Sequence, residues 1–270
     1  MSRIEAAFRA AVRERRAALV PFLTAGWPDR ASCLRLLVGL ADAGADVIEL
    51  GVPFSDPIAE GPTIQRASER ALRAGASLRR ILDLVKRLRP RVDVPLVLMG
   101  YANPFYAMGE GRFAEAAAEV GVDGLIVADL PPEEGQGLYA AVEQRGVDPI
   151  LLAAPTTTPA RLAMLARRTR GFLYYVSLTG VTGARARMAA GLEAGVRRVR
   201  ETSEVPVCVG FGVSTPEQAG EIARFADGVV VGSAIVDRIE TAASREAAVD
   251  AVARFVAELK APLRQGGTPA

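Results

Sequence analysis

The sequence predicts one closed barrel of eight parallel strands, each followed by a helix, with an extra helix before the first strand. Eight short apolar runs alternate with helical runs, which is typical of parallel strands joined by helical crossovers. The chain has 270 residues, half of them apolar, and no change of composition divides it. A helix end, small residues, an Asp and an apolar strand recur in that order at 43–49, 120–126 and 225–231. We therefore expect a single (β/α)8 TIM-barrel domain over residues 1–270, with 265–270 as a frayed tail.

Each expected element carries a local signal. Asp29 can cap the helix that Gly44 ends, and Pro62 is suited to the first turn of another helix. Short apolar runs bounded by Gly or Pro indicate the strands. The expected strands are 18–24, 46–50, 94–100, 124–128, 148–153, 172–177, 207–209 and 228–231. The expected helices are 2–17, 29–43, 62–74, 77–89, one ending at 120, 133–145, 159–169, 190–202, 215–225 and 243–260, with loops at 101–106, 178–187 and 232–235.

The composition excludes several classes of site. The chain has no histidine, which excludes a Ser-His-Asp triad and any His-ligated metal. Acid–base chemistry must therefore use Asp, Glu, Lys, Tyr or Cys. The basic residues are scattered, which argues against a nucleic-acid surface. Cys33 and Cys208 match no metal spacing, so we expect them to be buried free thiols. No signal peptide or membrane-spanning run is found, so we expect a cytoplasmic protein.

Two carboxylates mark the loop after the second expected strand. Glu49 lies near the end of the apolar run 46–50, where an unpaired charge is costly. Glu60 follows across a loop rich in proline, just before the helix that begins at Pro62. Paired carboxylates in different environments are a common device for acid–base chemistry. The alternative is a strand-end Glu that caps a backbone group and a solvated loop Glu, and position alone leaves both open.

In such a barrel, catalytic residues lie at the C-terminal ends of the strands. Two glycine-containing turns there, 210–214 and 232–233, favour phosphate binding after strands seven and eight, although each alone is typical of any tight turn. Thr182 and Gly183 lie in a long loop that could close over the ligand or be an ordinary surface loop. Polar candidates at the strand ends are Glu49, Glu60, Tyr101, Asn103, Asp129, and Tyr174 or Tyr175. Apolar candidates for a flat pocket, or for barrel packing, are Phe22, Leu98, Ile126 and Phe211.

Several motifs, in order over nearly the whole chain, resemble the tryptophan synthase alpha subunit family. The segment 49–65 is the most specific of them. The others are 21–28, 101–104, 129–131, 177–183 and 210–214.

The resemblance implies a TIM-barrel lyase that cleaves indole-3-glycerol phosphate to indole and glyceraldehyde 3-phosphate in tryptophan biosynthesis. It implies no metal and no cofactor in this chain. The implied partner is a beta subunit that uses pyridoxal phosphate, in an alpha2beta2 complex. Two alternatives stay open: another phosphate-binding barrel enzyme, such as a sugar-phosphate isomerase, and an inactive activator of a beta subunit.

The resemblance also implies roles for residues. Glu49 matches the catalytic glutamate. Glu60 stands where the family has an aspartate, so its side chain is longer by one methylene. The implied substrate-binding residues are Phe22, Leu98, Tyr101, Ile126, Tyr174, Thr182, Gly183, Phe211, Gly212, Val213, Gly232 and Ser233. The implied partner interface includes Asp56, Pro57 and Asn103.

Overall fold

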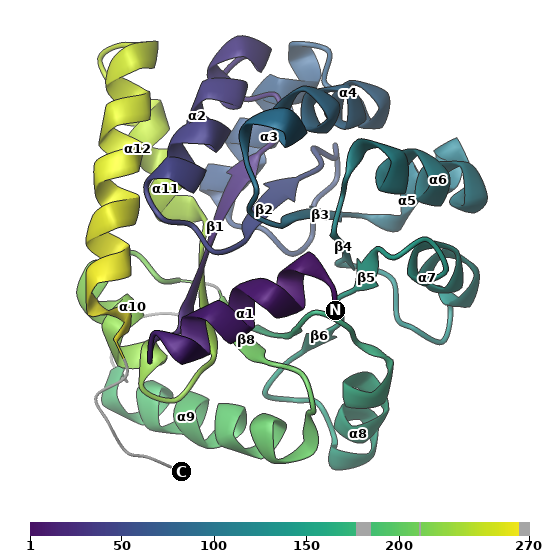
Figure 1. Cartoon of the computed structure of the whole chain (residues 1–270), viewed down its shortest axis with the longest axis vertical. Coiled ribbons are helices and arrows are strands. Elements are labelled where there is room, and N and C mark those ends of the chain that lie inside the picture. Colours follow the sequence, from purple (N-terminus) through teal and green to yellow (C-terminus); the bar gives the residue numbers. More distant parts are fainter. Residues whose placement is uncertain (177–184, 211, 265–270) are drawn as a thin grey trace.

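Helices and strands alternate along the chain, and Figure 1 shows the helices as a ring around the strands. The computed structural model describes residues 1–176, 185–210 and 212–264. The strands are β1 (Ala18–Thr24), β2 (Ile48–Gly51), β3 (Leu96–Gly100), β4 (Gly124–Val127), β5 (Asp148–Pro149), β6 (Leu152–Ala153), β7 (Leu173–Val176), β8 (Val207–Gly210) and β9 (Gly228–Val231). The helices are α1 (Arg3–Arg13), α2 (Arg30–Asp42), α3 (Pro62–Arg73), α4 (Leu78–Leu88), α5 (Ala102–Met108), α6 (Glu110–Val120), α7 (Gln136–Glu143), α8 (Pro159–Arg168), α9 (Arg185–Thr202), α10 (Pro216–Ala223), α11 (Ser233–Thr241) and α12 (Arg245–Lys260), with short 3-10 helices at Arg89–Arg91 and Ala261–Leu263. Among the described residues, no helix is both long enough and apolar enough to cross a membrane.

The sheet closes through the fifth expected strand. The strand order is β5-β4-β3-β2-β1-β9-β8-β7-β6, and every pairing between these strands is parallel. The two ends of this order, β5 and β6, are consecutive pieces of the run 148–153. β5 pairs with β4, and β6 pairs with β7. The predicted closed barrel with an N-terminal helix is confirmed. The exact extent of the domain stays a prediction, and residues 265–270 lie outside the described part.

Three connections differ from the sequence prediction. Residues 101–106, expected as a loop, contain the start of α5. The backbone N–H of Ala102 donates to Asp129 Oδ1 at 2.8 Å, so a residue 27 positions away supports this helix start. Ser233 begins α11 directly after β9, where a turn was expected. Helix α9 begins at Arg185, earlier than expected, and the rest of the expected loop lies outside the described residues.

Side chains alternate between two layers of the core. Along β3, Val97 and Met99 belong to the cluster inside the barrel, whereas Leu96 and Leu98 pack outside, against the helices. Helix α1 lies across the N-terminal end of the barrel in Figure 1, and its Ile4, Phe8 and Ala11 join the inner cluster. The barrel interior is therefore closed by α1 at this end, which leaves the C-terminal end for a ligand.

The recurring Asp seen in the sequence has one structural role at all three positions. The carboxylates of Asp46, Asp123 and Asp227 precede β2, β4 and β9. Each accepts a backbone N–H at the beginning of the neighbouring preceding strand, at 2.8 to 2.9 Å. The donors are Leu19, Leu96 and Val207. The repeat therefore fixes adjacent strands to one another at their N-terminal ends.

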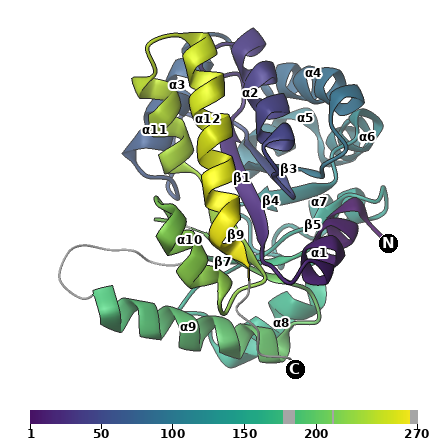
Figure 2. The same cartoon turned by 60° about the vertical axis from the view of Figure 1, so that its left-hand side comes forward.

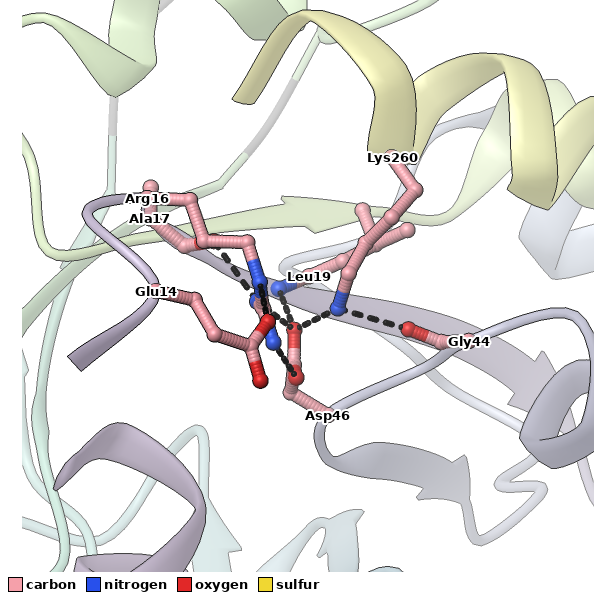
Figure 3. A network of polar contacts seen from close by, with 7 residues as sticks. All are labelled: Glu14, Arg16, Ala17, Leu19, Gly44, Asp46 and Lys260. Atoms are coloured by element: carbon pink, nitrogen blue, oxygen red, sulfur yellow. Dashed lines mark hydrogen bonds and ion pairs between the residues drawn. The ribbon is translucent and has the colours of Figure 1, made fainter. Parts of the chain in front are cut away.

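Asp46 is also the centre of the polar network in Figure 3. Two guanidinium nitrogens of Arg16 donate to its carboxylate at 2.7 and 2.8 Å, and Lys260 Nζ donates to it as well. Lys260 Nζ also donates to the carbonyl of Gly44 at 2.8 Å. The side chains of Arg16 and Asp46 are each 10% exposed. The network joins β1, the start of β2 and α12, which lies beside α2 in Figure 2.

Candidate active site

Glu49 lies inside the barrel, near the C-terminal end of β2. It is in register with Phe22 of β1 and Val97 of β3, both of which belong to the inner cluster. The residue is 1% exposed, and its Oε2 has no hydrogen-bond partner among the described residues. Burial, with a smaller contribution from the nearby charge of Glu60, raises the pKa of Glu49 to about 8. Glu49 is therefore a neutral carboxylic acid at pH 7, able to give a proton.

Glu60 lies in the loop between β2 and α3. The hydroxyl of Tyr101, which follows β3, donates to Glu60 Oε2. Burial raises the pKa of Glu60, the Tyr101 hydrogen bond lowers it, and the charge of Asp129 raises it, with a net shift upward. The charge of Glu60 acts on Glu49, so the structure brings together the two carboxylates that the sequence indicated.

The side chains of Tyr174 and Tyr175 lie on opposite faces of β7. Tyr174 belongs to the inner cluster, and its pKa is raised well above the ordinary value by burial, with further contributions from Glu49 and Glu60. Its hydroxyl lies against Gly210, where any side chain would clash with it. Tyr175 faces outward, toward Gly195 of α9. Tyr174 is therefore the tyrosine that shares the barrel interior with the carboxylates.

The expectation for Leu98 is wrong, because this side chain belongs to the outer cluster. Met99 is the residue of β3 that faces inward at this level, and sequence reasoning missed it. The signal was available in part, since alternation puts Leu98 and Met99 on opposite faces. The register with Glu49, which only the structure gives, decides which face is inside.

Phe22 and Ile126 lie inside the barrel as expected. The Phe22 ring covers Gly51, and a side-chain carbon placed on Gly232 would lie 3.4 Å from this ring. The start of α11 therefore adjoins the apolar pocket. Phe211, the fourth expected pocket residue, lies outside the described residues.

Part of the expected phosphate site is described. Gly212 follows β8 with φ +80°, a conformation that favours glycine, and Val213 is buried. Ser233 is the first residue of α11, directly after Gly232. The first N–H groups of a helix lack partners within the helix, and its dipole is positive at this end, which suits an anion. Thr182 and Gly183 lie outside the described residues.

The remaining candidates lie on the rim of the barrel. Asp56 and Asn103 are exposed and Pro57 is half-buried. Close to them along the chain are two large exposed apolar side chains that sequence reasoning missed, Ile58 at 80% and Tyr106 at 41% exposure. Among the described residues, no group of three His, Cys, Asp or Glu side chains could hold a metal ion.

A closed α/β barrel with a neutral buried acid, a second carboxylate and a helix N-terminus at one end defines a TIM-barrel enzyme of the acid–base type. The chain matches the family model described as "Tryptophan synthase alpha chain" over residues 8–264, and it belongs to this family. The reaction is the family's cleavage of indole-3-glycerol phosphate, a lyase reaction of tryptophan biosynthesis that needs no cofactor in the alpha chain.

Relatives and solved structures agree over nearly the full length. The chain is 52% identical to the tryptophan synthase alpha chain of Geobacter sp. strain M21 over 266 residues, covering 98% of this chain and 99% of the relative. It is 54% identical to that of Caulobacter vibrioides strain NA1000 over 242 residues, covering 89% and 88%. A crystal structure of tryptophan synthase subunit alpha from Legionella pneumophila superposes with a TM-score of 0.90 at 38% identity, covering 97% of this chain and 98% of the other. A chain from Mycobacterium tuberculosis tryptophan synthase gives 0.89 at 40% identity, covering 98% and 99%.

Proposed function

We propose that Glu49 and Glu60 divide the acid–base work of indole-3-glycerol phosphate cleavage. Glu49 gives its proton to C3 of the indole ring, which leaves positive charge on the ring nitrogen. The resulting carboxylate then takes the proton from the side-chain hydroxyl on the carbon attached to C3. The C–C bond breaks, its electron pair returns to the ring, and indole and glyceraldehyde 3-phosphate are released. The raised pKa of Glu49 supports this role, because it keeps the proton available at neutral pH.

Glu60, in its ionised form, accepts the ring N–H. Its negative charge then lies where positive charge develops in the transition state. The hydrogen bond from Tyr101 supports this role, because it favours the charged form of Glu60. No step of this sequence requires a metal or an organic cofactor.

The substrate is held at two places in this proposal. Four side chains of the inner cluster line the indole pocket: Phe22, Met99, Ile126 and Tyr174. The resemblance adds Phe211, which lies outside the described residues. The phosphate binds at the other side, next to the start of α11. Its binding residues in this proposal are Gly212, Val213, Gly232 and Ser233. The resemblance adds Thr182 and Gly183, which lie outside the described residues. A side-chain carbon placed on Gly232 would touch the Phe22 ring, which supports adjacent indole and phosphate subsites.

The rim near the loop after β2 and helix α5 is proposed to bind the beta subunit, which holds pyridoxal phosphate, in an alpha2beta2 complex. Asp56, Pro57 and Asn103 lie on it, and the exposed Ile58 and Tyr106 add apolar surface. Exposed apolar side chains framed by polar ones are typical of protein interfaces. This places the partner beside the loop that carries Glu60.

The burial of Glu49, whose Oε2 has no hydrogen-bond partner among the described residues, is the observation that carries the proposal. Glu49→Gln nearly preserves the shape of this side chain and removes its proton. We expect indole release to fall at least about 10²-fold, the low end for a positioned acid–base group, while substrate binding is retained. The exposed Glu115→Gln is the matched control and should leave indole release unchanged.

Near-parental indole release by Glu49→Gln would place the acid elsewhere. A parent chain that stimulates a beta subunit but releases no indole would instead support the rival interpretation, an inactive activator. Both measurements use indole-3-glycerol phosphate with a beta subunit in excess.

A further inference from the structure

The hydroxyl of Tyr101 joins the loop after β2 to its functional carboxylate. The residue is 2% exposed, and its ring stacks on Phe54 with centroids 5.0 Å apart and planes 26° from parallel. Backbone N–H groups of Ile58 and Ala59 each donate to the hydroxyl oxygen at 2.9 Å. The same hydroxyl donates to Glu60 Oε2. One side chain therefore contacts four residues of the loop, the first at Phe54 and the last at Glu60.

These contacts fix the direction of the hydroxyl proton. A tyrosine hydroxyl has one hydrogen and two acceptor positions. The N–H groups of Ile58 and Ala59 occupy both acceptor positions, so the hydrogen is directed at Glu60 Oε2. That oxygen must accept, and a hydrogen bond of this kind favours the ionised carboxylate.

The site can hold one negative charge on its two carboxylates more easily than two. Glu49, Asp129 and Tyr174 are the titratable groups that interact with Glu60 besides Tyr101. Tyr174 and Cys208 interact with Glu49 besides Glu60. In the described part of the chain, none of these neighbours is a cation. Burial favours the neutral form of Glu49, whereas the Tyr101 hydroxyl is the strongest of the hydrogen-bond donors that favour the charged form of Glu60, ahead of the backbone N–H groups of Glu60 and Ala59.

We propose that Tyr101 is a positioning residue that assigns the negative charge to Glu60 and so leaves the transferable proton on Glu49. The inference rests on the roles proposed above for these two carboxylates. Because Tyr101 binds the loop at Ile58 and Ala59 as well as the carboxylate, it also sets where the longer Glu side chain places its charge. The assignment of charge and the position of the loop are thus fixed by one group.

The test is the pH dependence of indole release by Tyr101→Phe, with indole-3-glycerol phosphate and a beta subunit in excess. In the active form Glu60 is ionised and Glu49 is protonated, so the acid limb of the profile reports Glu60 and the alkaline limb reports Glu49. Loss of the hydroxyl raises the pKa of Glu60, because a hydrogen bond to its charged form disappears. We expect the acid limb to move up by about one pH unit, since a hydrogen bond to a charged group changes an equilibrium roughly tenfold or more.

The alkaline limb should stay in place, because Glu60 is ionised at that pH in both proteins. Activity lost below neutral pH should therefore return as the pH rises, which a purely structural defect would not show. Tyr139→Phe is the matched control: it removes another buried tyrosine hydroxyl, one that donates to the backbone carbonyl of Leu130 at 2.8 Å. Its pH profile should keep both limbs.

A uniform loss of activity in Tyr101→Phe with an unmoved acid limb would overturn the inference and leave Tyr101 as a structural support of the loop. Glu60→Ala separates this from a failure of the proposed function. If Glu60→Ala releases indole like the parent, the role of Glu60 itself is wrong. If Glu60→Ala is impaired and Tyr101→Phe shows no shift, only the inference about Tyr101 is wrong.

Discussion

Asp46 and Glu49 are three residues apart, yet these two carboxylates lie in opposite environments at the two ends of the barrel. Asp46, at the N-terminal end, is paired with Arg16 and Lys260 and accepts a backbone N–H. Glu49, toward the C-terminal end, is buried, and no Arg or Lys in the described part of the chain is paired with it. A paired carboxylate holds elements together, whereas an unpaired buried one keeps its proton at neutral pH. The difference shows that partner choice, more than residue type, separates the stabilising end of this barrel from its reactive end.

The largest expected effect is on stability, at the paired end. Asp46→Ala leaves Arg16, Lys260 and the N–H of Leu19 without their acceptor, so we expect the free energy of unfolding to fall by about 3 to 5 kcal/mol. Urea unfolding measures it. Asp83→Ala is the control, because Asp83 is exposed and only distantly paired with Arg30; its effect should stay below about 1 kcal/mol. Equal effects of the two substitutions would show that the network in Figure 3 contributes little.

The buried carboxyl of Glu49 should make the stability of the fold depend on pH. The pKa of Glu49 is near 4.5 when unperturbed and about 8 in the fold, so between these values the folded chain holds a proton that the unfolded chain has lost. Stability from this group is therefore full below pH 4.5 and is lost as the pH rises to 8, at about 1.4 kcal/mol per pH unit. Glu49→Gln cannot ionise and should lack this loss. Relative to the parent, it should gain a few kcal/mol between pH 5 and pH 8.

Urea midpoints of the parent and Glu49→Gln at pH 5, 6.5 and 8 measure this gain. The exposed Glu115→Gln removes a carboxylate without a buried environment, and its stability should follow that of the parent across the series. If the stability of Glu49→Gln also follows that of the parent across this pH series, Glu49 is not a buried acid with a raised pKa. The contrast with Asp46 would then fail.

The sequence was most informative where a rule is local. The strand at Ala18–Thr24, the cap at Asp29 and the helix start at Pro62 follow from nearby residues, and all three are as predicted. The cost of burying a Glu marked position 49 as unusual, but position alone left open whether Glu49 and Glu60 form a working pair. The recurring Asp was visible as a pattern, but its role was not, since each acceptor reaches a donor 20 to 27 residues away.

What the sequence could not give depends on contacts between distant segments. Helix α5 was missed because its first N–H is satisfied by Asp129, in the loop after the next strand. Leu98 was chosen in place of Met99 because alternation gives two faces without saying which is inside; only the register with β2 decides. The hydrogen bonds that Tyr101 accepts from Ile58 and Ala59 and donates to Glu60 likewise join segments whose approach no local pattern predicts.

The smallest expected effect concerns Glu60, where the resemblance implies an aspartate. Glu60→Asp shortens the side chain by one methylene, while Tyr101 still holds the loop at Ile58 and Ala59. The carboxylate should therefore retreat by roughly one C–C bond, and a displacement of ~1 Å at a reacting group can cost up to about 10²-fold. We expect Glu60→Asp to keep a measurable fraction of indole release without exceeding the parent, and Glu60→Ala to lose most of it.

Indole release by the three proteins under one condition, with substrate binding checked separately, decides the point. An Asp variant faster than the parent would mean that the loop is not fitted to Glu, and an Ala variant as fast as the parent would make Glu60 a solvated loop residue, with Asp56 or Asp129 as the next candidate for holding the indole nitrogen.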